Sequence, residues 1–119
     1  MKQQQKWFLA ELIFRLHDQH QPAAHHFDRY YFPLHAFSAK EAYQMALIKA
    51  SCELDNRRDY TKDYLQWEFV GLAALTQIER LKADSAYHQA MKTPDDIPTF
   101  VYDLRKQNAA IQLQLTEVV

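Results

Sequence analysis

The sequence predicts an α+β protein in which an antiparallel sheet opens with a long N-terminal hairpin, carries one packed helix and is followed by a C-terminal helix. Three observations predict this class. Apolar residues alternate with a period of two near the N-terminus, the segment 38–41 has the form of a helix cap, and apolar residues recur at helical spacing near the C-terminus. At 119 residues the chain is expected to form one domain, residues 1–119.

The first two predicted strands form the hairpin. In residues 6–17 every second residue is apolar, which places one set on a single strand face: Phe8, Ala10, Leu12, Phe14 and Leu16. The other face has mixed character and holds Trp7, Leu9, Glu11, Ile13, Arg15 and His17. A polar tip follows, and residues 26–37 are rich in aromatic side chains, as strands are. Pro33 lacks a ladder donor and indicates an edge position or a bulge.

A helix is predicted over residues 39–54. Ser38 and Glu41 form a capping box, and an alanine-rich face, which includes Ala42, Ala46 and Ala50, is suited to lie close against a sheet. A second apolar stripe lies on roughly the opposite side of this helix: Met45, Ile48 and Cys52. We expect the C-terminal helix to lie across the first helix and cover this stripe, with Cys52 in the core. The charged residues 55–59 are expected to be a solvated loop.

The rest of the chain is predicted to add a third strand and the C-terminal helix. Residues 64–78 resume sheet character, and Gly71 interrupts the apolar run as a β-bulge does. Residues 85–92 fit either a short strand or a helical turn. Residues 93–96 have the composition of a helix start, and apolar residues then recur at helical spacing, interrupted by Asn108. A strand over 99–104 is the competing interpretation.

Composition argues against several classes of function. A net charge of -1 provides no basic surface for a phosphate backbone, so binding to nucleic acid is not expected. One cysteine permits no intrachain disulfide, and the N-terminal residues show neither a signal peptide nor a membrane span. A cytoplasmic protein without membrane contact is therefore expected. The single glycine leaves no glycine-rich phosphate loop, and no cofactor is predicted.

The chain resembles a known family over roughly residues 6–80. The resemblance rests on Lys6-Trp7-Phe8-Leu9-Ala10-Glu11-Leu12-Ile13-Phe14, on Ala36-Phe37-Ser38-Ala39-Lys40-Glu41-Ala42-Tyr43, and on Trp67-Glu68-Phe69-Val70-Gly71-Leu72. It is similar to the bacterial domain-of-unknown-function family 4288, small proteins with a strand-strand-helix-strand core. The resemblance implies that fold and a bacterial or phage-related cytosolic setting, but no activity. The segment after about Leu81 is longer and more helical than the family pattern.

Two groups of polar residues suggest chemistry. His17 and His26 are expected to face each other across the hairpin, where imidazoles and nearby carboxylates would suit zinc or nickel; the alternative is a solvated loop. Glu11, Arg15 and Glu68 are considered as an acid/base group on one sheet face, although the orientation of Glu68 is open; the alternative is ordinary ion pairing. No catalytic residue is assigned.

The function favoured by the sequence is protein–protein interaction or regulation, for example an immunity-like role or self-association. Its predicted surface consists of Trp7, Leu9, Ile13, Tyr31 and Trp67, because exposed apolar sheet positions usually mark association. The alternatives are a metal-dependent or acid/base enzyme that uses His17, His26, Glu11 and Arg15, and a single-stranded nucleic-acid binder that stacks bases on the aromatic residues.

Overall fold

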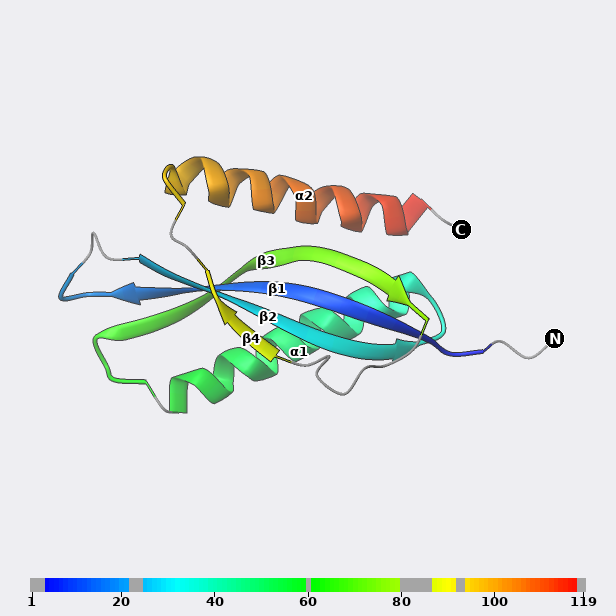
Figure 1. Cartoon of the computed structure of the whole chain (residues 1–119), viewed down its shortest axis with the longest axis horizontal. Helices are drawn as coiled ribbons and strands as arrows, with labels where there is room; N and C mark the ends of the chain where they lie inside the picture. Colours follow the sequence, from blue (N-terminus) through cyan, green and yellow to red (C-terminus); the bar gives the residue numbers. More distant parts are fainter. Residues whose placement is uncertain (1–3, 22–24, 60, 80–86, 92–93, 118–119) are drawn as a thin grey trace.

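The computed structural model confirms the α+β class (Figure 1). It describes residues 4–21, 25–59, 61–79, 87–91 and 94–117. The elements follow in the order β1 (Lys6–Asp18), β2 (His25–Ala36), α1 (Ala39–Asp59), β3 (Leu65–Ile78), β4 (Tyr87–Ala90) and α2 (Ile97–Glu117). Within the segment 85–92, residues 87–90 therefore form a strand, and residues 99–104 are helical.

The sheet is antiparallel with the strand order β3-β1-β2-β4 (Figure 1). β1 is an interior strand, so side chains on both of its faces need cover. Phe8, Leu12 and Phe14 on one face are buried, and Ile13 on the other face is also buried, with 1% of its surface exposed. This position in the sheet explains why the second face of β1 has mixed rather than solvated character.

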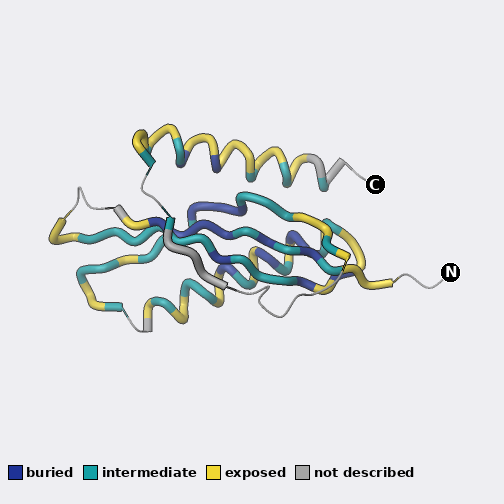
Figure 2. The backbone as a smooth tube through the Cα atoms, viewed as in Figure 1, coloured by how far each residue is buried: buried dark blue, intermediate teal, exposed yellow. Residues whose placement is uncertain are grey.

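α1 covers the face that carries the even-numbered residues of β1. Its small inner residues Ala42, Ala46 and Ala50 are almost fully buried, together with Tyr43, in one core with Phe8, Leu12 and Phe14. Alanine on the contact side brings the helix backbone close to the strands, as the sequence predicts. We name this cluster the α1 core. Figure 2 shows buried residues along the strands and at intervals along α1.

α2 packs mainly on the opposite face, and the prediction that it lies across α1 is wrong. Val101 and Leu104 of α2 are buried in a second cluster with Ile13, Phe27 and Val70, which we name the α2 core. In Figure 1 the strands lie between the two helices. Only the C-terminal half of α2 comes round toward the α1 core, through Ile111 and Leu115. The physical reason is that Ile13 and Phe27 offer apolar surface on a face that α1 cannot reach.

α2 therefore does not cover the side of α1 that faces away from the sheet. Ile48 is 65% exposed, and Cys52 is exposed rather than part of the core as predicted. Met45 alone of the predicted stripe is partly buried against the α1 core. α1 also extends to Asp59, so residues 55–59 form its last turn instead of a loop. Arg57 and Arg58 there suit the negative end of the helix dipole.

Both helices begin at side-chain caps. The Glu41 amide donates to Ser38 Oγ at 3.1 Å, which confirms Ser38 as the N-cap of α1. Asp96 caps α2, because its carboxylate accepts from the Thr99 amide at 3.1 Å. Two hydrogen bonds from Thr99 lower the pKa of Asp96. The larger effect comes from its backbone amide and the smaller from its side chain. Pro98 lies in the first turn of α2, as expected.

α2 is joined to β3 by polar side chains. Asn108 Oδ1 accepts from the Leu72 amide at 3.0 Å, and Gln107 Nε2 donates to the Ala73 carbonyl at 2.7 Å. The β1–β3 register shifts at two places next to these residues, between Glu11 and Leu12 and between Ile13 and Phe14. Asn108 therefore interrupts the apolar pattern of α2 because its side chain accepts a hydrogen bond from a backbone amide of β3.

Replacement by alanine should lower the free energy of unfolding much more at the buried Ile13 than at the exposed Ile48. Ile13→Ala removes three carbons from the α2 core and should lower the free energy of unfolding by about 2–4 kcal/mol. Ile48→Ala should change it by less than about 0.5 kcal/mol, since the side chain is mostly in water. Urea unfolding followed by circular dichroism measures both, and equal effects would contradict the position of α2.

Loss of the Asn108 amide should weaken the attachment of α2. Asn108→Ala leaves the Leu72 amide without its acceptor and should cost about 1–2 kcal/mol in urea unfolding. Asn56→Ala, at an exposed position of α1, is the matched control and should be close to neutral. If the two variants unfold at the same urea concentration, the Asn108 contact does not stabilise the fold.

Candidate functional site

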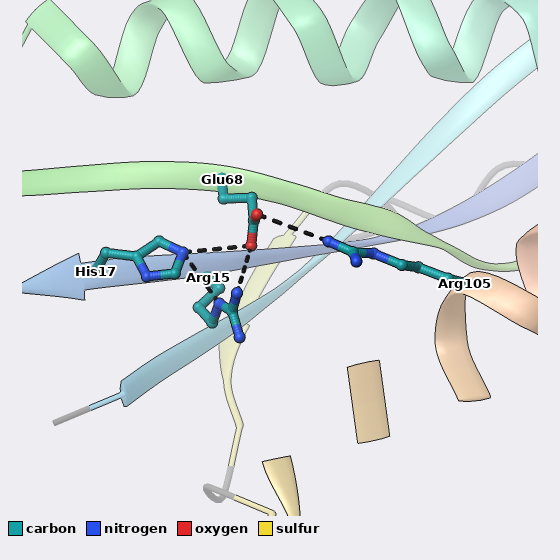
Figure 3. Close-up of polar contacts among 4 residues, drawn as sticks. All are labelled: Arg15, His17, Glu68 and Arg105. Atoms are coloured by element: carbon teal, nitrogen blue, oxygen red, sulfur yellow. Dashed lines mark hydrogen bonds and ion pairs between the residues drawn. The ribbon is translucent and has the colours of Figure 1, made fainter. Parts of the chain in front are cut away.

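A charged cluster surrounds Glu68 on the face of the sheet that α2 covers (Figure 3). β1 and β3 pair so that Arg15 lies opposite Glu68, which puts both side chains on one face. Arg15 Nη2 is 2.9 Å from Glu68 Oε1, and Arg105 of α2 is 3.8 Å from Oε2. The same face was considered for Arg15 and Glu68 in the acid/base hypothesis, and the register confirms it.

His17 adds a proton-dependent contact to this cluster. Its Nε2 accepts from Arg15 Nε at 3.1 Å and also lies 3.3 Å from Glu68 Oε1. One nitrogen cannot serve both partners in the same state: it accepts from Arg15 when unprotonated and donates to Glu68 when protonated. Nε2 therefore makes one of these two hydrogen bonds at a time, according to the imidazole tautomer, beside the Arg15–Glu68 ion pair.

A cleft of about 780 Å³ adjoins the cluster at the N-terminal end of α2. Its charged lining consists of two arginines, Arg15 and Arg105, and two aspartates, Asp95 and Asp96. These charges balance, and Arg15 and Arg105 already contact Glu68. The cleft therefore offers no strong preference for an ion of either sign.

The hairpin does not bring the two predicted metal ligands face to face. His17 pairs with His25, and His26 lies opposite Leu16. Side chains of directly opposite residues share a face, so His17 and His26 point to opposite sides of the sheet. The expected pairing was wrong by one residue on β2: this strand begins at His25, and His25 rather than His26 lies opposite His17. In the described ranges there is no group of three or more His, Cys, Asp or Glu side chains that could hold a metal ion.

Glu11 is paired away from the Glu68 cluster. Its Oε1 lies 2.8 Å from Arg29 Nε on the neighbouring strand β2. The pair lies on the floor of a cavity of about 220 Å³ between the sheet and α2, which Asp103 and Gln107 help to line. Glu11, Arg15 and Glu68 therefore share a sheet face without forming one constellation.

The structure divides the predicted interaction surface. Trp7, Leu9 and Tyr31 lie on one sheet face and are partly exposed. Ile13 shares that face but is buried beneath α2, and Trp67 lies on the other face because it pairs with Leu16. Parity along β1 could place Trp7, Leu9 and Ile13 on one face. The β1–β2 register is needed to place Tyr31, and the β1–β3 register is needed to place Trp67.

The partly exposed apolar residues of this face lie near one another, with the exposed polar residues His35 and Thr76 among them. Pro33 lies opposite Leu9 on β2, and Ile78 lies opposite Trp7 on β3. We name the partly exposed set the open sheet face, which consists of Trp7, Leu9, Tyr31, Pro33 and Ile78. At its margin the Trp7 and His35 rings stack at 4.4 Å with 9° between their planes.

Arg57 forms a second polar centre, on the α1 side of the sheet, which the sequence analysis missed. Its Nη2 is 2.6 Å from Asp28 Oδ2 and its Nε is 3.1 Å from Glu53 Oε1. The guanidinium also lies over the rings of Phe14 and Trp67, at 4.5 and 4.3 Å from their centroids. The spacing of Glu53 and Arg57 was the available signal, since it joins side chains on one helix face.

Tyr30 borders this centre and is 8% exposed. Burial raises the pKa of its hydroxyl, the negative charge of Glu53 adds to the rise, and Arg57 opposes it. A raised pKa means that the folded state favours the neutral phenol. The resulting stability is present below the ordinary pKa of tyrosine and is lost as the pH rises through the raised value.

Comparison with models of protein families, with curated proteins and with solved structures finds no match to this chain. The resemblance to the domain-of-unknown-function family 4288 therefore stays a prediction. In the described parts of the chain, neither helix has the length and apolar character that crossing a membrane requires.

Arg57 should be essential to stability while its neighbour is not. Arg57→Met leaves Asp28 and Glu53, which are 19% and 14% exposed, without their counter-ion, and should lower the free energy of unfolding by about 2–4 kcal/mol. Arg58→Met removes a side chain that is 64% exposed and should cost less than about 0.5 kcal/mol. Denaturant unfolding compares the two, and a neutral Arg57 variant would refute the role assigned to this centre.

Proposed function

We propose that this chain is a small cytosolic protein–protein interaction module that binds a partner protein through the open sheet face. The single observation behind this proposal is that three strands together present partly exposed apolar and aromatic side chains at one end of the sheet. The apolar contacts of α2 with this face centre on Ile13 and Phe27, so the helix does not bury the open sheet face. An apolar surface of this kind typically marks association.

The side chains of the open sheet face suit a protein surface. Trp7 and Tyr31 combine large apolar area with a polar group, and both residue types are enriched where proteins meet. They project from paired strands, so little conformational entropy is lost when a partner binds. A module that covers part of its partner's surface in this way would regulate that partner, as immunity-like proteins do.

The cytosolic setting is supported by Cys52. It is a free and exposed thiol, which a reducing compartment preserves. The family resemblance adds a bacterial setting to the proposal.

The enzyme alternative has weaker geometric support. Its four residues do not converge, because His26 lies on the far face and Glu11 pairs with Arg29. The nucleic-acid alternative would need a continuous stacking platform, but Trp67 is on the opposite face from Trp7 and packs against Arg57.

A charge placed in the open sheet face should abolish partner binding without unfolding the protein. Leu9→Lys is predicted to reduce capture of a protein partner by at least about tenfold, because binding would bury the ammonium group. Gln66→Lys is the matched control, since Gln66 is exposed on the same sheet face at the far end of β3. Affinity capture from bacterial lysate, followed by titration of the purified partner, measures the effect. Equal capture by the wild type and Leu9→Lys, with both folded, would refute the proposal.

A further inference from the structure

The outer side of α1 is a second surface, separate from the open sheet face. Its exposed residues are Lys40, Gln44, Leu47, Ile48, Ser51, Cys52 and Asp55, with Phe37 before the helix and Arg58 in its last turn. Ile48 is 65% exposed, Leu47 is 37% exposed and Phe37 is 45% exposed. The inner side of the same helix is buried in the α1 core, so the helix is fixed against the sheet and its outer side faces away from the sheet.

We propose that a second copy of this chain docks antiparallel along the outer side of α1. If a two-fold axis passes between Leu47 and Ile48, residues equally far from the axis meet across the interface. Leu47 then meets the second copy's Ile48, and Gln44 meets its Ser51. Lys40 meets the second copy's Asp55, and Phe37 meets its Arg58, a pairing that suits a cation over an aromatic ring.

The charges on this side of α1 complement those of a second copy better than they serve the helix itself. Lys40 is a cation in the first turn, where the helix dipole favours an anion, and Asp55 lies toward the end that favours a cation. Arg58 offsets Asp55 within the chain at 3.4 Å, through a pair that is largely exposed. In the antiparallel arrangement each of the two charges meets its opposite, and the two helix dipoles also run in opposite directions.

The dimer is expected to be weak. One pair of helices in contact over about four turns buries less than the roughly 1,200 Å² of total surface found in stable complexes. The apolar contribution comes from Leu47, Ile48 and Phe37 of each copy. We therefore expect a dissociation constant in the micromolar range or above, and a dimer that weakens with salt because its outer contacts are ionic.

A charge exchange tests the arrangement directly. Lys40→Glu and Asp55→Lys should each raise the dimer dissociation constant about fivefold to tenfold, because symmetry creates two like-charge contacts in place of two ion pairs. The double variant Lys40→Glu/Asp55→Lys should return to within about threefold of the wild type. Both substitutions agree with the helix dipole, so neither is expected to unfold the monomer. Sedimentation equilibrium at low salt, over micromolar to millimolar protein, measures all four proteins.

Ile48→Asp is the companion variant, and it should eliminate the dimer by placing a charge next to the axis. Recovery in the double variant supports the antiparallel dimer. A wild type that is monomeric at millimolar concentration, or a double variant as weak as the singles, would overturn it. Dimerisation that is lost in Leu9→Lys but kept in Ile48→Asp would also overturn it, and would assign self-association to the open sheet face instead.

Discussion

The burial of β1 on both faces is the constraint on which the rest of the structure depends. β1 runs through the interior of the sheet for thirteen residues, and it carries Leu12 and Phe14 on one side and Ile13 on the other. One helix can cover only one of these faces. The chain therefore needs α1 for the first face and α2 for the second, and the sheet becomes the middle layer of three (Figure 1).

This layering determines where polar chemistry can occur. Arg57 lies at the border of the α1 core, near the C-terminal end of α1. Its guanidinium pairs with two carboxylates and lies over two aromatic rings. Glu68 holds a comparable place beside the α2 core, with Arg15 on its own sheet and Arg105 on the helix. Both centres bind a helix to the sheet by ionic contacts at the border of an apolar cluster. Because these ion pairs link a helix to the sheet, we assign them a structural role. The proposed functions therefore rest on surfaces outside them.

Local patterns in the sequence predict the elements better than they predict their arrangement. The alternation in residues 6–17, the Ser38 cap and the start of α2 near Pro98 are local, and the structure confirms all three. The side of the sheet on which α2 packs depends on where Ile13 and Phe27 are left uncovered, which is a tertiary property. Asn108, a polar residue in the apolar stripe of α2, indicates in the sequence that this helix contacts a strand backbone.

The candidate surfaces show the same limit. Parity correctly grouped Trp7 and Leu9, but the pairing of His17 with His25 depends on a hairpin register that a one-residue change in the tip reverses. Arg57 was overlooked because a charged helix end resembles a solvated loop when its distant partner Asp28 is unknown.

The most direct test of the two-faced β1 is the set of nuclear Overhauser effects from the Ile13 methyl groups. The structure predicts strong effects to the methyl groups of Val101 and Leu104, because all three residues belong to one buried cluster. Effects between α2 and Ile48, with none between α2 and Ile13, would place both helices on one side and contradict the account.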